Sequence, residues 1–172
     1  LIEKGLTKLD NVHLVIDKTD YRISLYSNKI LVKTYKAVFG KRSGTIKSSA
    51  DDNITPIGDY KICAIDTLNK YHKFFHLDYP NERDAAEALK QRYIFDDEFN
   101  TIILAAKENK CPPKETKLGS EIGIQGIGTY NIIFKNLPFA FNWTNGSIAV
   151  SNESIDELYS VIKVGTPVKI IN

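Results

Sequence analysis

The opening segments of the chain partly alternate between apolar and polar side chains, which is the pattern of strands with one buried face. The short polar run 18–20 separates Val12–Asp17 from Tyr21–Tyr26 and predicts a hairpin between them. Leu31–Phe39 and Asp59–Ile65 are predicted to be further strands. The N-terminal part of the chain is therefore expected to consist of strands and turns.

A long polar stretch follows the third of these strands. Gly40–Asn53 is rich in Gly, Ser, Lys and Asp and has no hydrophobic periodicity, which predicts an exposed loop. Loops of this length are often functional, so this stretch is a candidate for a binding segment.

Two helices are predicted in the middle of the chain. Asn81 is a suitable N-cap for a helix over Glu82–Arg92, which has acidic residues in its first turn and basic residues near its end. A second apolar run predicts a helix over Phe99–Lys110, and Pro112-Pro113 would stop it.

The clearest helical pattern lies near the C-terminus. Apolar residues recur there at i, i+3, i+4 and i+7, namely at Ile155, Leu158, Tyr159 and Ile162. Either Ser151 or Asn152 is expected to cap this helix, and Gly165 is expected to end it. Val168–Ile171 is predicted to be a closing strand.

The composition is that of a globular domain of ordinary size. Of the 172 residues, 42% are hydrophobic and 26% are charged, which excludes intrinsic disorder and a membrane-spanning class. A formal net charge of +2 is too small to indicate nucleic acid as a partner. We expect a single domain over residues 1–172 without membrane insertion. The chain has no Met and begins at Leu1, so we expect a trimmed N-terminus that lacks localisation signals.

The two cysteines, Cys63 and Cys111, permit one intramolecular pairing and do not have the spacing of a zinc site. Buried free thiols are the favoured interpretation, and a bridge is the alternative in an oxidising compartment. No set of His, Cys, Asp and Glu residues has the spacing of metal ligands, so neither a metal nor another cofactor is expected.

Three segments are more specialised than a plain core requires. Ile54–Tyr60 combines Pro and Gly just before a strand, and Gly119–Gly128 is a predicted strand that ends in glycines. Asn142–Asn152 contains a Gly-Ser turn that leads through a short strand into the C-terminal helix. Such a turn can direct a side-chain nucleophile and two backbone N–H groups at one point.

Together these segments resemble the L,D-transpeptidase catalytic domain, or YkuD domain, of bacterial cell-wall enzymes. Five segments carry the likeness in order: Thr55–Tyr60, Phe75–Asp84, Pro112–Gly119, Asn152–Tyr159 and Val164–Val168. The resemblance implies a mixed α+β, β-rich fold, a β-sandwich with about three peripheral helices. It also implies an enzyme whose cysteine thiolate attacks a peptidoglycan stem peptide and passes the acyl group to an amine or to water. The periplasm or cell envelope is the implied location.

The chain departs from the family at both reactive side chains. Gln125-Gly126 stands where the family has His-Gly, and Gly146-Ser147 stands where it has Gly-Cys. Ser147 would therefore occupy the nucleophile position and Gln125 the base position, while Gly126 and Gly146 would provide oxyanion or turn geometry. A serine hydroxyl needs a stronger base than a thiol, and a carboxamide cannot accept a proton, so transpeptidation should be lost.

Binding of a stem peptide is predicted to survive this loss. The candidate binding residues are Trp143, Tyr130, Asn145 and His76. Each candidate also has a structural interpretation: Ser147 and Gln125 as ordinary turn and hydrogen-bonding residues, and Trp143 and His76 as packing residues. His13 and His72 show no partner pattern in the sequence.

Several functions fit the double replacement. We favour a natural family member that is catalytically impaired and still binds at the cell wall, with Gly126 and Gly146 as remnants of the site. The second interpretation is an active Cys/His transpeptidase or carboxypeptidase that was inactivated by design. The third is a hydrolase in which His76 serves Ser147, and the fourth is an interaction scaffold that does not bind peptidoglycan.

Overall fold

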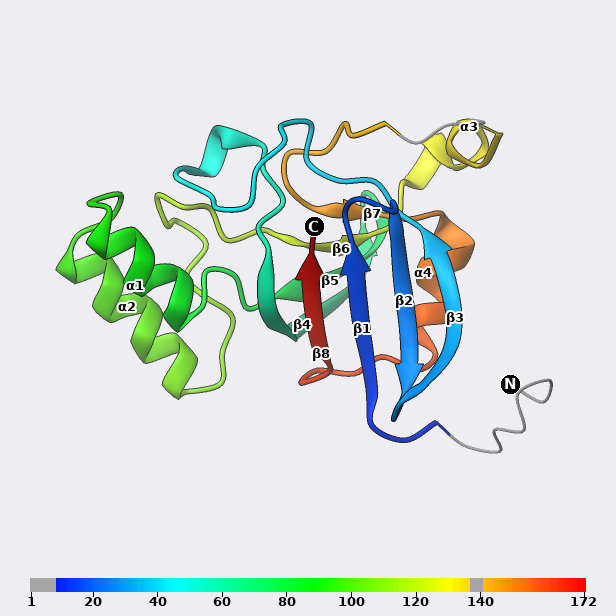
Figure 1. The fold of residues 1–172 in the computed structure, drawn as a ribbon, viewed down its shortest axis with the longest axis horizontal. Helices are drawn as coiled ribbons and strands as arrows, with labels where there is room; N and C mark the ends of the chain where they lie inside the picture. Colours follow the sequence, from blue (N-terminus) through cyan, green and yellow to red (C-terminus); the bar gives the residue numbers. More distant parts are fainter. Residues whose placement is uncertain (1–8, 137–140) are drawn as a thin grey trace.

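One sheet of eight strands organises the fold in a computed structural model, which describes residues 9–136 and 141–172 (Figure 1). Its strands are β1 (Val12–Asp17), β2 (Arg22–Ser27), β3 (Ile30–Lys36), β4 (Gly58–Asn69), β5 (His72–Leu77), β6 (Gly123–Gln125), β7 (Ile148–Ala149) and β8 (Pro167–Ile171). They lie in the order β3-β2-β1-β8-β4-β5-β6-β7. The C-terminal strand is therefore inserted between the N-terminal hairpin and β4, where it runs parallel to β1 and antiparallel to β4.

The predicted hairpin is confirmed, and its first strand has the predicted bounds. The third strand ends at Lys36 instead of Phe39, because the chain then leaves β2 and turns toward the opposite edge of the sheet. The fourth strand continues past Ile65 to Asn69 because β5, which the sequence analysis did not predict, pairs back along it.

A backbone pair joins the two edges of the sheet and makes it curl. The Val38 N–H donates to the Ala149 carbonyl at 3.0 Å, and the Ala149 N–H donates to the Val38 carbonyl at 2.9 Å. The segment after β3 is thereby fixed to β7, the last strand in the order. The curled sheet buries residues from both ends of the order in one core, including Ile23, Phe75 and Ile124.

Four α-helices occur in the described residues, one more than the three that the sequence predicts. They are α1 (Glu82–Lys90), α2 (Asp96–Lys107), α3 (Asn131–Asn136) and α4 (Asn152–Tyr159), and the 3-10 turns are η2 (Ala50–Asp52) and η3 (Gly128–Tyr130). Helices α1 and α2 pack together beside the sheet (Figure 1). None of the helices in these residue ranges is both long and apolar enough to cross a membrane. The β-rich, mixed α+β class is confirmed.

The helix boundaries follow local signals. The Asn81 side chain caps α1 by accepting hydrogen bonds from two backbone N–H groups, as predicted. Helix α2 begins at Asp96, before the predicted Phe99, and three acidic residues occupy its first turn, where they stabilise the N-terminus. The cap of α4 is Ser151, whose hydroxyl accepts from the Ser154 N–H. Helix α4 ends at Tyr159, before Gly165, although Ile162 remains buried.

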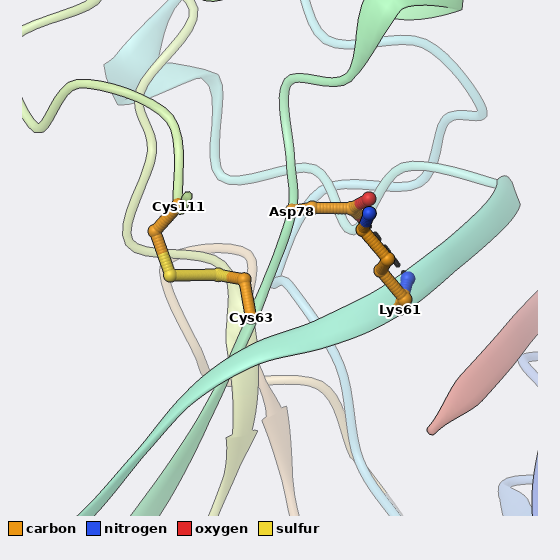
Figure 2. The surroundings of a disulfide bond; sticks show 4 residues. All are labelled: Lys61, Cys63, Asp78 and Cys111. Carbon is orange, nitrogen blue, oxygen red and sulfur yellow. Dashed lines mark hydrogen bonds between the residues drawn. A yellow bond between two sulfur atoms is a disulfide. The ribbon is translucent and has the colours of Figure 1, made fainter. Parts of the chain in front are cut away.

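A disulfide joins Cys63 of β4 to Cys111 in the segment after α2 (Figure 2). The favoured prediction of two free thiols is therefore wrong, and the alternative of a bridge is correct. The bridge spans 48 residues of sequence and closes a loop that contains β5, α1 and α2. Nearby, the Lys61 N–H of β4 donates to the carboxylate of Asp78, the residue after β5, at 2.8 Å. This bond holds the end of β5 against β4.

Replacing both cysteines by Ala should lower the free energy of unfolding by about 2–4 kcal/mol, because the unfolded chain regains the entropy that the long closed loop removes. Urea denaturation with and without a reductant measures this change. The original protein should lose stability on reduction, whereas the Cys63→Ala, Cys111→Ala variant should not respond. An original protein that is indifferent to the reductant would contradict the bridge.

Candidate functional site

A cleft of about 510 Å³ contains most of the side chains that the sequence singled out. Gln125 and Ser147 both line it, together with Trp143, Asn145 and His76. Other residues of its wall come from the long loop before β4, from the turn between β4 and β5, and from the segment 114–122. Five of the predicted site residues therefore share one cavity.

The register of three strands places these side chains. Gln125 in β6 lies opposite Phe74 in β5, and Gly123 lies opposite His76. Strand β7 begins directly after Ser147 and runs parallel to β6. Residues two apart on a strand point to the same face, so the cleft-lining side chains of β5 and β6 lie on the same side of the sheet.

The Ser147 hydroxyl is bonded to a neutral acceptor. It donates to the backbone carbonyl of Glu121 at 3.1 Å. The backbone carbonyl of Ser147 accepts from the Thr144 hydroxyl at 2.5 Å, which fixes the turn that carries the serine. A backbone carbonyl cannot remove the hydroxyl proton, so this arrangement does not activate Ser147 as a nucleophile.

Gln125 is 4% exposed and lies at the end of the central strand of the site. Its backbone carbonyl accepts from the Val150 N–H at 2.9 Å, which continues the pairing between β6 and the segment after β7. The side chain is a carboxamide, which donates and accepts hydrogen bonds but has no basic nitrogen at neutral pH. Gln125 can therefore orient a polar ligand and cannot serve as a general base.

Thr55 ties the proline-containing element to the serine turn. Its hydroxyl donates to the Gly146 carbonyl at 2.7 Å and accepts from the Gly40 N–H at 2.8 Å. Thr55 is 1% exposed, so no water can replace either bond without a rearrangement. The Pro and Gly of this element are evident in the sequence, whereas the positioning role of its threonine depends on contacts to Gly40 and Gly146 that no local pattern reveals.

The two glycines beside the reactive positions are required by the packing of the fold. A Cβ on Gly126 would lie 2.4 Å from the Tyr71 carbonyl oxygen. Gly146 has a φ of 124°, and a Cβ there would lie 2.9 Å from the Ile54 carbonyl oxygen. The Gly126 N–H also donates to the Lys73 carbonyl at 3.1 Å. The packing of the fold is enough to explain both glycines. Their presence therefore does not favour ligand binding, contrary to the inference from the sequence.

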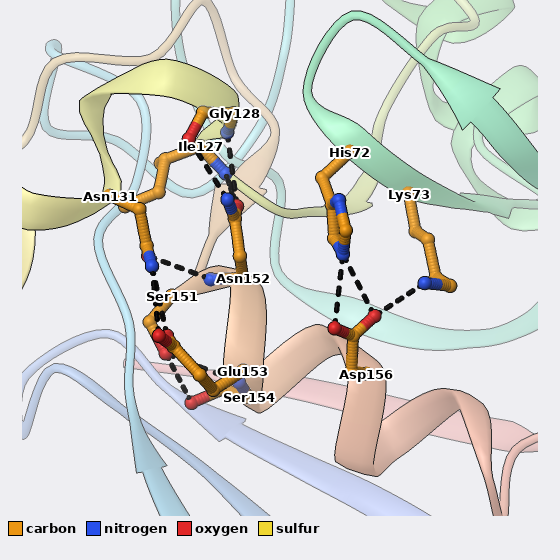
Figure 3. Close-up of polar contacts among 10 residues, drawn as sticks. All are labelled: His72, Lys73, Ile127, Gly128, Asn131, Ser151, Asn152, Glu153, Ser154 and Asp156. Atoms are coloured by element: carbon orange, nitrogen blue, oxygen red, sulfur yellow. Dashed lines mark hydrogen bonds and ion pairs between the residues drawn. The ribbon is translucent and has the colours of Figure 1, made fainter.

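Asn152 fixes the chain just beyond Gln125-Gly126 (Figure 3). Its side-chain oxygen accepts from the N–H groups of Ile127 and Gly128 at 3.0 Å, and its amide donates to the Gly128 carbonyl at 2.9 Å. Its own N–H donates to the Asn131 side chain at 2.8 Å. The first residue of α4 is therefore a positioning residue for the end of β6, beyond the capping role that the sequence suggested.

His72 has a partner that the sequence did not reveal. Its Nε2 lies 2.9 Å from a carboxylate oxygen of Asp156 in α4, and Lys73 pairs with the same carboxylate (Figure 3). The pKa of Asp156 is lowered, because these hydrogen bonds and charges outweigh the opposing effect of burial. His72 and Asp156 are 84 positions apart in the chain, so no local pattern could have paired them.

Among the other candidates, His76 lines the cleft, and burial lowers the pKa of its imidazole, which favours the neutral form. Tyr130 does not line the cleft; it lies in a neighbouring hollow that shares Trp143 with it.

A buried ion pair between Lys47 and Asp52 supports the loop wall of the cleft. Burial alone would raise the pKa of Asp52, but Lys47 and backbone N–H donors outweigh that effect and lower it.

A family model described as YkuD, the L,D-transpeptidase catalytic domain, matches residues 11–170. A comparison with curated proteins finds no significant match. Within the described residues, no group of three His, Cys, Asp or Glu side chains is arranged to hold a metal ion.

Several solved structures share the fold at low sequence identity. Bd1075 of Bdellovibrio bacteriovorus is 21% identical with a TM-score of 0.58, and the match covers 95% of this chain and 48% of that one. Pgp2 of Campylobacter jejuni, a helical cell shape determining protein, is 19% identical with a TM-score of 0.59, covering 92% and 46%. An L,D-transpeptidase from Mycobacterium smegmatis is 13% identical with a TM-score of 0.52, covering 94% and 59%. This chain thus spans about half the length of the first two structures.

Replacing Thr55 by Val should lower the free energy of unfolding by about 2–3 kcal/mol, because the Gly40 N–H and the Gly146 carbonyl would both lose a buried partner. Val has nearly the same shape, so packing should change little. Urea denaturation measures the effect, with Thr34→Val on exposed strand β3 as the control. Equal stability of the two variants would refute the positioning role of Thr55.

Asp52→Asn should destabilise the protein by about 3 kcal/mol at pH 7, because Lys47 would be left as an unpaired buried charge. The pKa of Asp52 is lowered in the folded state, so its stabilisation is complete above about pH 4, the ordinary carboxyl range, and is lost as the pH falls through the folded value. The stability difference between the original protein and the variant should therefore shrink below about pH 4. Urea denaturation from pH 7 to pH 2.5 tests this, with the exposed Asp51→Asn as the control; a constant difference across that range would contradict it.

Proposed function

The chain belongs to the YkuD family of L,D-transpeptidase catalytic domains, and from this premise we propose that it binds peptidoglycan stem peptides in cell-wall maturation without catalysing L,D-transpeptidation. The observation that carries the proposal is the cleft that Gln125 and Ser147 both line. Its volume of about 510 Å³ lies within the range of sites that enclose small ligands. The side chains of Gln125 and Ser147 can form hydrogen bonds to a ligand but cannot supply a base and an activated nucleophile.

The loss of catalysis follows from the acid–base properties of these two residues. A serine hydroxyl becomes a useful nucleophile only when a nearby base removes its proton. Ser147 instead donates to the Glu121 carbonyl, and the Gln125 carboxamide cannot accept a proton. General-base catalysis alone contributes about 10²–10⁴-fold to such reactions, and the absence of a thiolate adds to the deficit.

Binding is supported by the polar groups that line the cleft. Gln125 and Asn145 carry amides that both donate and accept hydrogen bonds, as a peptide backbone requires. Trp143 provides an aromatic wall, and burial lowers the pKa of His76, which favours its neutral form. A peptide in this cleft would exchange its hydrogen bonds to water for bonds to the protein without meeting an unpaired buried charge.

The cell envelope, and the periplasm in particular, is the proposed location. The disulfide between Cys63 and Cys111 supports this, because disulfides persist mainly in oxidising compartments outside the cytosol. Stem peptides of the cell wall are accessible in the same compartment.

His76 is the observation that favours a second candidate function. It lines the cleft with Ser147, and burial lowers its pKa, which favours the neutral imidazole, the form that can accept a proton. A hydrolase in which His76 activates Ser147 would cleave a stem peptide without Gln125 taking part. Cleavage of disaccharide tetrapeptide by the original protein, abolished by His76→Gln, would support this candidate over a purely binding role.

Gln125→His combined with Ser147→Cys should raise turnover of disaccharide tetrapeptide by at least about 100-fold, because the pair restores a thiol and a base. Neither single variant should show this gain. Mass spectrometry of the released and transferred products measures it, with circular dichroism to establish that each variant is folded. No gain in a folded double variant would mean that the cleft lacks other features needed for the reaction. His and Cys codons at these positions in the source gene would show instead that the protein was inactivated by design.

The original protein should sediment with purified peptidoglycan sacculi, and soluble stem peptide should compete for this binding. Gln125→Ala should weaken sedimentation, because the cleft would lose a central amide. Asp20→Ala, on the exposed turn between β1 and β2, is the control. A protein that stays in the supernatant under all conditions would favour the scaffold interpretation.

A further inference from the structure

A second hollow adjoins the cleft, and only apolar and aromatic residues line it. Its volume is about 310 Å³, and its lining residues, called here the apolar groove, are Ile127, Tyr130, Ile133, Phe134, Phe141 and Trp143. Tyr130 and Ile133 are 67% and 61% exposed, although large apolar side chains are usually buried. Several exposed apolar side chains around one hollow are typical of a binding surface.

One wall of the apolar groove is built on backbone that is anchored to α4. The N–H of Ile127 donates to the Asn152 side chain at 3.0 Å. The Asn131 amide at the start of α3 donates to the Glu153 carboxylate at 3.0 and 3.1 Å (Figure 3). These bonds hold the turn η3 and helix α3, which carry three of the six groove residues.

Trp143 also lines the groove, and its two neighbours in the chain are both hydrogen-bonded to Phe39 in the segment after β3. The Phe39 N–H donates to the Asn142 side-chain oxygen at 2.9 Å, and the Thr144 N–H donates to the Phe39 carbonyl at 3.1 Å. The backbone on either side of the Trp143 indole is therefore held in place. Anchored walls reduce the ordering cost that a ligand would otherwise have to overcome.

The apolar groove and the cleft are neighbours, because Trp143 lines both. We propose that the groove is a glycan subsite, which takes the pyranose ring of an amino sugar joined to the peptide in the cleft. This inference rests on the proposed function and extends the ligand from a stem peptide to a glycopeptide. The polar cleft would hold the peptide part and the apolar groove the sugar part.

The lining of the groove favours a sugar ring over a second peptide segment. Four of the six lining residues are aromatic, and the faces of aromatic rings carry partial negative charge that attracts polarised C–H groups. A pyranose presents such C–H groups on its face and keeps its hydroxyl groups at the rim, in contact with water. A peptide backbone would place N–H and C=O groups against side chains that offer almost no hydrogen bonds, which is unfavourable.

Titration calorimetry with disaccharide tetrapeptide and with the free tetrapeptide of the same sequence tests the inference. The original protein should bind the disaccharide form about tenfold more tightly, which is the gain expected from one buried apolar contact surface. Ile133→Ala should bring this ratio close to one, and so should Tyr130→Ala. Ile132→Ala is a matched control, since Ile132 is the preceding residue on α3, is 74% exposed and does not line the groove, so the ratio should persist.

The outcomes separate this inference from the function on which it rests. Equal binding of the two ligands by the original protein would overturn the glycan subsite and leave the proposed function standing. The absence of binding by either ligand would overturn both. An Ile133→Ala variant with an unchanged affinity ratio, but with altered self-association or altered binding to phosphatidylcholine vesicles, would assign the groove to a second copy or a lipid surface and overturn the inference.

Discussion

The backbone pair between Val38 and Ala149 is the interaction on which both the fold and the cleft depend. It joins the chain after β3 to β7 and so curls a sheet whose two edges would otherwise lie far apart. The same contact brings Gly40 beside Thr144, so the loop before β4 lies against the turn that carries Ser147. Thr55 then fixes that turn through the Gly146 carbonyl. The cleft is thus a consequence of closing the sheet, and its walls are set before any ligand is present.

The features that shape the cleft differ from those that would perform chemistry in it. Gly126 and Gly146 are required because neighbouring carbonyl oxygens leave no room for a Cβ, and Asn152 is required to satisfy the backbone beyond β6. None of these roles depends on a nucleophile or a base. A carboxamide and an alcohol at Gln125 and Ser147 are compatible with the same backbone, so the architecture can persist where acid–base chemistry is absent. Fold membership therefore establishes the cleft, and the reaction has to be argued from the side chains.

The parts of the fold that depend on nearby residues could be predicted from the sequence. Strand β1 and the capping of α1 by Asn81 follow from patterns within a few positions, and the structure confirms both. The Cys63–Cys111 bridge and the His72–Asp156 contact depend on segments that are distant in sequence; the contact was missed and the bridge was not favoured. Strand β5 pairs with the adjacent β4 across a short turn and was nevertheless not predicted. Helix α3 has only six residues and exposes most of its apolar side chains, so it lacks a periodic signal. The candidate residues of the site were found because the segments resemble a family, and their shared cavity could not be read from spacing alone.

The Cys63–Cys111 bridge also bears on how the cleft would behave outside its native surroundings. Cys111 lies three positions before Lys114, and the segment from Lys114 to Ile122 contributes one side of the cleft. The crosslink to Cys63 therefore restrains, against β4, the chain that leads into this side of the cleft. In protein prepared in a thiol-containing buffer, or produced in a reducing cytosol, this side of the cleft would be held less firmly than in the oxidised protein. Affinities measured on such preparations would understate what the oxidised molecule can hold.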